Sequence, residues 1–220
     1  MTISLTYEEK IAILDLGDDE NRFSPSFLDD IDARLDEIVA GGADGLVTTA
    51  TGKFYTNGLD LDWLAAHSEQ TQWYVGRVQG LLARMLTLPI PTAAAVVGHA
   101  FGAGAMLAVA HDFRVMRADR GYFCFPEVDI NIPFTPGMAA LIQAKLAPHA
   151  AVASMTTGRR FGGTDAASIG IVDATAAEGA VTDAALDLLR PLSGKNQQTL
   201  GAIKQTMFAQ AVDALTGGIT

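Results

Sequence analysis

The segment VGHAFGAGAMLAVAHD, residues 97–112, sets three glycines before an Ala-rich run, and an acidic residue follows at Glu127. Residues 92–97 are small and β-branched, which favours a buried strand, whereas residues 103–110 are of types that favour a helix. Glycine lets a ligand approach the backbone closely, and the first N–H groups of a helix lack partners within it. This junction is therefore typical of a site that binds an anion or a developing oxyanion. Glu127, in the apolar segment YFCFPEVDI, is a candidate base for that site.

A second glycine turn, Asn57-Gly58, follows another short apolar stretch at residues 46–50. Asn-Gly is a strong turn dipeptide, and the backbone N–H of Leu59 lies just past it. Alone, this sequence is typical of a surface turn. Two such turns after two buried strands, however, supply two N–H donors, and an enolate oxygen is stabilised by converging donors of this kind.

Simpler interpretations of the same residues remain. Residues 93–110 approach the roughly 18 apolar residues of a membrane-spanning helix, but they include three glycines and His99. The spacing G-x-x-x-G-x-G differs from the dinucleotide-binding pattern G-x-G-x-x-G. The glycines could also pack a helix against a sheet without a ligand, and Glu127 could be a solvated surface residue. Other parts of the sequence are needed to decide between these interpretations.

Four blocks of sequence together resemble the enoyl-CoA hydratase/isomerase, or crotonase, family. They are KFYTNGLDLDWL, PTAAAVVGHAFGAGAMLAVAHDFRVMRADRG, FCFPEVDI and TGRRFGGTDAASIGIVD. The likeness covers residues 46–173 and is nearest to the plant-type Δ3,Δ2-enoyl-CoA isomerases. It implies an α/β fold in which repeated ββα units form a spiral core at residues 1–175. It also implies a C-terminal helical region at residues 176–220 that forms trimers and covers CoA.

The resemblance implies roles for individual residues. The backbone N–H groups of Leu59 and Ala103 correspond to the oxyanion donors, and Glu127 corresponds to the catalytic carboxylate. Where hydratases of the family place another glutamate, three residues after the helix-start donor, this chain has Met106. The predicted substrate-binding positions are Gly58, Asp60, Phe101, Gly102, Met106 and Phe134, with Phe101, Met106 and Phe134 as candidate apolar walls.

One missing carboxylate changes the expected chemistry. Adding water to a 2-enoyl thioester is helped by two carboxylates, and methionine can neither orient nor deprotonate water. Moving a double bond from C3 to C2 requires only one base, which takes a proton from C2 and returns it to C4. The sequence therefore predicts a Δ3,Δ2-enoyl-CoA isomerase. A hydratase with Asp60 or Asp129 as its other carboxylate, another enolate-forming acyl-CoA enzyme and a non-catalytic acyl-CoA-binding homologue are the alternatives.

Composition limits the possible partners. A net charge of −10 argues against nucleic acid, and the sole cysteine, Cys124, excludes an internal disulfide, which fits a cytoplasmic protein. No membrane segment, metal-ligand spacing or G-x-S-x-G motif is evident, so we expect no membrane partner, no metal and no cofactor beyond the CoA of the substrate. The resemblance implies a homotrimer or a dimer of trimers. The cations that could neutralise CoA phosphates are Lys53, Arg159, Arg160, Lys195 and Lys204.

Local patterns predict the elements that position these residues. Two strands at 3–7 and 10–16 precede a helix that begins after Ser24 or Ser26 and ends near Ala40. Further strands are expected at 46–50, 92–97 and 113–116, with 54–60 as a turn and a helix-prone stretch around Trp63 and Trp73. The remaining predicted helices cover 103–110, 137–146, 150–156, 164–168, 182–189 and 195–215.

Overall fold

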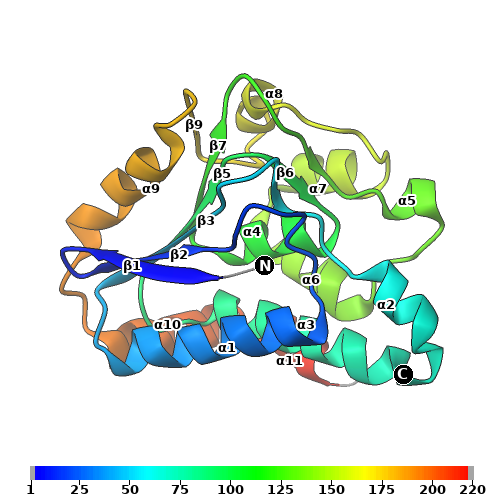
Figure 1. The fold of residues 1–220 in the computed structure, drawn as a ribbon, viewed down its shortest axis with the longest axis horizontal. Helices are drawn as coiled ribbons and strands as arrows, with labels where there is room; N and C mark the ends of the chain where they lie inside the picture. The colour runs from blue at the N-terminus through cyan, green and yellow to red at the C-terminus, as the bar shows by residue number, and fades with distance from the viewer. Residues whose placement is uncertain (1–2, 218–220) are drawn as a thin grey trace.

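Two β-sheets form the centre of the protein in the computed structural model, which describes residues 3–217. The larger sheet has the strand order β1-β2-β3-β5-β7-β9, and the smaller has the order β4-β6-β8 (Figure 1). The larger sheet consists of β1 (Ser4–Glu8), β2 (Ile11–Asp15), β3 (Gly45–Thr49), β5 (Thr92–Val96), β7 (Phe113–Arg117) and β9 (Ala174–Ala176). The smaller consists of β4 (Phe54–Thr56), β6 (His99–Phe101) and β8 (Phe123–Cys124).

The strand pairing confirms the repeated ββα unit. After the antiparallel β1-β2 hairpin, every neighbouring pair in both sheets is parallel. The chain adds a strand to the larger sheet, then one to the smaller sheet, and then returns through one or more helices. Each return brings the end of a smaller-sheet strand next to the start of a helix, which is where the predicted oxyanion donors lie.

Helices cover both faces of the larger sheet. They are α1 (Pro25–Ala40), α2 (Leu61–Ala66), α3 (Thr71–Leu86), α4 (Ala103–Ala110), α5 (Glu127–Ile130), α6 (Pro136–Lys145), α7 (Pro148–Met155), α8 (Gly163–Ser168), α9 (Val181–Leu189), α10 (Gln197–Met207) and α11 (Ala209–Thr216). Two 3₁₀ turns occupy Ser68–Gln70 and Arg190–Leu192. Helix α1 begins as predicted, since the Ser24 hydroxyl accepts a hydrogen bond from the Phe27 N–H at 3.2 Å.

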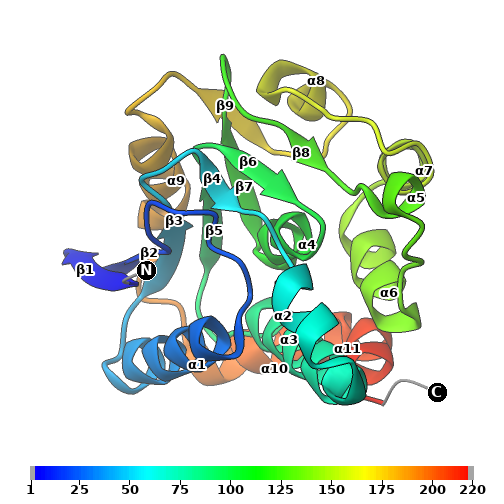
Figure 2. The same ribbon diagram turned by 45° about the vertical axis from the view of Figure 1, so that its right-hand side comes forward.

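Helix α4 lies at the centre of the helical side, and Figure 2 shows it between the smaller sheet and the layer that contains α3 and α11. All eight of its residues are buried. On the opposite face of the larger sheet, α9 buries Val181, Leu186 and Leu189 against β-strand side chains. Residues 93–110 are thus parts of two strands and a short helix, and none of the helices in residues 3–217 is long and apolar enough to cross a membrane.

The structure differs from the predicted elements in several places. Residues 54–56 form β4 rather than part of a turn, and β6, β8 and β9 are additional strands. The expected single helix at 195–215 is divided into α10 and α11 at Phe208, whose ring is buried in the core. The predicted boundary between residues 175 and 176 falls inside β9. Side chains of α11 belong to the same hydrophobic core as those of α3 and α6.

Candidate active site

The two glycine turns lie against each other. A Cβ added to Gly58 would lie 2.6 Å from the carbonyl oxygen of Phe101 and 2.9 Å from the backbone nitrogen of Ala103. Gly58 also has φ = +78°, and Gly102 has φ = +51°, a backbone region that favours glycine. Both turns therefore require glycine, one for contact with the other turn and each for its backbone conformation.

Two residues with unpaired backbone N–H groups line one cavity. Within residues 3–217, neither the Leu59 N–H nor the Ala103 N–H donates to another protein atom. Both residues line the same cavity of about 300 Å³. An unpaired N–H is costly when buried, so the two groups are available for an oxygen atom of a ligand. The cavity is lined by Arg22, Asn57, Leu59, Leu61, Asp62, Phe101, Gly102, Ala103, Pro126, Glu127, Ile130 and Ile132.

Asn21 holds the first turn in place, although its sequence context did not single it out. Its buried Nδ2 donates to the carbonyl oxygens of Gly17, Phe54 and Tyr55 at 3.1–3.2 Å. The Thr56 hydroxyl donates to the Asn21 carbonyl oxygen at 2.7 Å and accepts from a backbone N–H of the turn at 3.0 Å. Asn21 lies in the polar run DDENR, which is typical of an exposed loop, so no sequence signal marked it as buried.

Glu127 opens helix α5 and contributes a buried carboxylate to this cavity. Its exposed fraction is 9%, and its Oε2 has no hydrogen-bond partner within the described residues. Its Oε1 lies beside the second turn, since a Cβ added to Gly102 would be 3.6 Å from it. Burial raises the pKa of Glu127 to about 7, because the charged carboxylate is poorly solvated there. A carboxyl group with this pKa can accept and return a proton near neutral pH.

The other predicted site residues divide into two groups. Phe101 and Gly102 line the cavity, and Phe134 lines an adjoining groove together with Glu127. Met106 is 1% exposed and packs in the core, outside the cavity lining. Asp60 caps α2 by accepting from a backbone N–H at 3.0 Å and lines a neighbouring pocket.

The sequence also left several cavity residues unassigned, among them Arg22, Asp62 and Ile132. Asp62 is the other carboxylate of the lining, but its side chain is 90% exposed and forms an ion pair with Arg22 at 2.7 Å. Asp129 is exposed, and its carboxylate lies against Gly158 rather than in the cavity. Glu127 is therefore the buried carboxylate of this cavity.

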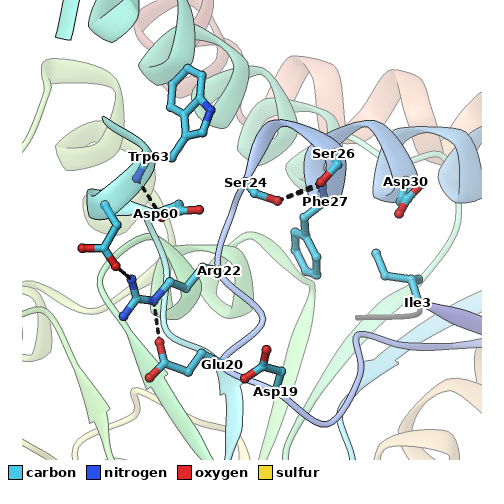
Figure 3. A pocket seen from close by; sticks show the side chains of 11 residues that line it. Ile3, Asp19, Glu20, Arg22, Ser24, Ser26, Phe27, Asp30, Asp60 and Trp63 are labelled. Carbon is cyan, nitrogen blue, oxygen red and sulfur yellow. Dashed lines mark hydrogen bonds and ion pairs between the residues drawn. The ribbon is translucent and has the colours of Figure 1, made fainter. Parts of the chain in front are cut away.

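A second pocket, of about 500 Å³, adjoins the site on the side of α1 and α2 (Figure 3). Figure 3 shows Arg22 beside Glu20, with Asp19, Asp30 and Asp60 around the same space. Arg22 also forms an ion pair with Asp62, which lines this pocket too. Five carboxylates and one paired guanidinium make this pocket strongly acidic. An anionic group is repelled from such surroundings.

The buried histidine has a structural role. His111 is fully buried, with its ring nitrogens hydrogen-bonded to Thr48 and to the carbonyl oxygen of Leu107. Burial lowers its pKa to about 3, so the ring is neutral. Among residues 3–217, no group of three or more His, Cys, Asp or Glu side chains is arranged to hold a metal ion.

A buried carboxylate and two unpaired backbone donors line one cavity, an arrangement that can stabilise negative charge on an oxygen atom of a ligand. The chain belongs to the enoyl-CoA hydratase/isomerase family, whose model matches residues 6–220, and it has the crotonase fold.

Three known proteins illustrate the relationship. Enoyl-CoA delta isomerase 3 of Arabidopsis thaliana is 34% identical over 205 residues, which cover 88% of this chain and 86% of that protein. The peroxisomal enoyl-CoA delta isomerase 1 of the same plant is 34% identical over 95% of this chain and 90% of its own length. The crystal structure of a probable enoyl-CoA hydratase from Mycobacterium tuberculosis matches 99% of this chain and 92% of that chain, with a TM-score of 0.91 and 26% identity.

Proposed function

We propose that the protein is a Δ3,Δ2-enoyl-CoA isomerase in which Glu127 is the only acid–base group. The observation that carries this proposal is the buried Glu127 carboxylate, with a raised pKa, in the same cavity as two unpaired N–H groups. The similarity to plant proteins named enoyl-CoA delta isomerases supports the same reaction.

The proposed reaction has two proton transfers. Glu127 takes a proton from C2 of a 3-enoyl thioester, and the electron pair moves through the conjugated system onto the thioester oxygen. The N–H groups of Leu59 and Ala103 stabilise this dienolate, and each donor is worth about 3–4 kcal/mol by analogy with other oxyanion sites. The protonated Glu127 then delivers its proton to C4, and the double bond ends between C2 and C3.

Hydration is disfavoured because it needs a second carboxylate to hold and activate the attacking water. Asp62 is paired with Arg22 and is open to solvent, and Met106 supplies no acid or base. The apolar residues of the lining, which include Leu61, Ile130 and Ile132, supply no further group that could hold a water molecule.

Conversion of trans-3-hexenoyl-CoA by the purified protein tests this proposal. The 2-enoyl and 3-hydroxyacyl products are scored separately for wild type, Glu127→Gln and, as the matched control, Asp129→Asn. We expect 2-enoyl-CoA from wild type and from Asp129→Asn, and a loss of about 10²- to 10⁴-fold in kcat for Glu127→Gln. If 3-hydroxyacyl-CoA is the main product, the protein is a hydratase rather than an isomerase. If the protein binds CoA but converts no substrate, it is a non-catalytic acyl-CoA-binding homologue.

Several further expectations belong to this proposal. No cofactor is required beyond the CoA of the substrate, so dialysis against a chelator leaves activity unchanged. The protein forms a homotrimer, or a dimer of trimers, through apolar surface such as that of Ile203 and Met207 on α10, which light scattering tests. A cytoplasmic location stays a prediction that cell fractionation checks.

A further inference from the structure

The end of helix α6 brings one lysine against the hydrophobic core. Lys145 is half-buried, and its Nζ lies 5.2 Å from the ring centroid of Phe208, at the junction of α10 and α11. Figure 2 shows α6 beside α11, and a Cβ added to Gly137, near the start of α6, would lie 2.7 Å from the backbone of α11. This close packing holds the Lys145 side chain against the protein, while part of it still reaches solvent.

The charged groups around Lys145 already have partners. The Lys204 amine lies 2.6 Å from the Asp112 carboxylate, and the Arg114 guanidinium lies 3.1 Å from the Asp173 carboxylate. Both cations also donate to backbone carbonyl oxygens. The Lys145 amine, in contrast, has no ion pair or hydrogen bond with any residue in the described range 3–217. We call these five residues the α6 charge cluster, in which three cations share two carboxylates.

An unpaired ammonium group is unfavourable in these surroundings. Burial is the main cause, and the charges of Arg114 and Lys204 add to it, so the pKa of Lys145 falls to about 8. Asp112 and Asp173 act in the opposite direction, but each is shared with a cation of its own. At pH 8 about half of the Lys145 amines are uncharged, against roughly 0.4% for a lysine of ordinary pKa. An uncharged lysine amine is a nucleophile.

The α6 charge cluster is separate from the candidate active site. Ala103 is the first residue of α4, whereas Arg114 donates to the carbonyl oxygen of His111, the residue that follows the end of this helix. The eight residues of α4 span about 12 Å. Lys145 is also outside the lining of the cavity that contains Glu127. A reaction at Lys145 therefore requires neither Glu127 nor the oxyanion donors.

We propose that Lys145 is an acyl-acceptor site, at which the lysine amine takes the acyl group of an acyl-CoA thioester. The Nζ atom attacks the thioester carbonyl carbon, a C–N bond forms, the C–S bond breaks, and CoA leaves as its thiolate. The attacking nitrogen releases a proton to solvent, and no oxidant or reductant is needed. The amide product carries no charge, so the repulsion from Arg114 and Lys204 is removed.

This inference goes beyond the proposed function, since the thioester serves here as an acyl donor and not as the substrate of an isomerisation. The chain offers its own comparison, because Lys10, Lys53 and Lys195 are exposed. Lys204 is buried and paired with Asp112. Among these lysines, Lys145 combines partial exposure with an amine that burial and neighbouring cations keep partly uncharged.

Timed acylation of the intact protein tests the proposal. Wild type is incubated with hexanoyl-CoA, a saturated thioester with no double bond to move, and peptide mass spectrometry measures the rate of acylation at each lysine between about pH 6 and pH 10. Lys145→Arg removes the acceptor but keeps the charge. Lys195→Arg is the matched control at an exposed lysine, and Glu127→Gln tests independence from the active site.

We expect Lys145 to be acylated about 10-fold faster than each exposed lysine at pH 8, because its larger uncharged fraction outweighs its weaker basicity and partial burial. Its rate levels off above about pH 8, whereas the rates at exposed lysines continue to rise. Lys145→Arg lacks the fast product, and Lys195→Arg and Glu127→Gln retain it. In denaturing urea the lysines react at similar rates.

Two results would overturn the inference. One is acylation of Lys145 no faster than that of the exposed lysines in the folded protein. The other is a rate at Lys145 that rises with pH in parallel with theirs. If Lys145 is acylated as expected but the protein isomerises no enoyl-CoA, the proposed function fails and the acyl-acceptor site stands.

Discussion

Burial of Glu127 predicts a specific pH dependence of the free energy of unfolding. The pKa of this carboxyl is about 7 in the folded protein and 4.5 for the model group. Between these two values the folded state binds more protons than the unfolded state, so raising the pH destabilises the folded state. The shift of about 2.5 units corresponds to about 3 kcal/mol, which is lost progressively between about pH 4.5 and pH 7.

Urea unfolding of wild type and Glu127→Gln at pH 4.5, 5, 6, 7 and 8 measures this effect. We expect the stability of the variant relative to wild type to rise by about 3 kcal/mol from pH 4.5 to pH 8, with most of the change below pH 7.5. The buried Gln amide of the variant changes the free energy of unfolding by an amount that does not depend on pH, so this amount cancels when values at different pH are compared. Glu9→Gln, at an exposed position in the β1-β2 turn, serves as the matched control. The reasoning is refuted if the difference in the free energy of unfolding between wild type and Glu127→Gln stays constant across this pH range within about 0.5 kcal/mol.

Three other predictions follow from the site and the core. The pH profile of kcat/KM rises through about pH 7 as Glu127 ionises; a profile already flat at pH 6 would exclude this group as the base. Gly58→Ala lowers kcat and lowers the free energy of unfolding by at least about 1–3 kcal/mol, because residue 58 has a positive φ and the added Cβ would lie 2.9 Å from the Ala103 nitrogen. A Gly58→Ala variant with the melting temperature and kinetic constants of wild type would contradict this prediction. Lys204→Met destabilises the protein by about 3–5 kcal/mol in chemical denaturation because the partly buried Asp112 loses its cation, and a loss under about 1 kcal/mol would show that solvent replaces it.

The sequence predicted those parts of the site that depend on local chemistry. Gly58 and Gly102 adopt the positive φ angles that favour glycine, and Ser24 caps α1 as its position indicates. The small residues at 92–96 form a fully buried strand, and the Ala-rich run that follows forms a fully buried helix. Each of these features follows from residues close together in the chain, so patterns of residue type were sufficient.

Features that depend on distant partners could not be derived from local patterns. Strands β4, β6 and β8 are two or three residues long and exist only because they pair with one another, so each resembles a turn when considered alone. Asn21 is buried because carbonyl groups more than 30 residues away accept its hydrogen bonds. The interruption between α10 and α11 occurs where the Phe208 ring enters the core, which the helical composition of residues 195–215 does not reveal.

The predicted substrate-binding residues also divide into those whose position follows from neighbouring residues and those whose position depends on distant segments. Phe101 adjoins the glycine turn and lines the cavity, whereas Met106, the fourth residue of α4, packs in the core instead. Arg22 and Ile132 reach the cavity from loops far apart in sequence. The resemblance to a family therefore pointed to Leu59, Ala103 and Glu127, which line one cavity, but only the packing of distant segments shows which other side chains surround them.

Nuclear magnetic resonance of trans-3-hexenoyl-CoA in D₂O tests the central claim most directly. Two rates are recorded for wild type and Glu127→Gln: the exchange of the C2 protons for deuterium and the movement of the double bond. If Glu127 is the only acid–base group, both rates fall together in the variant, by about 10²-fold or more. Continued C2 exchange at the wild-type rate in Glu127→Gln would show that another group removes this proton and would contradict the one-carboxylate mechanism.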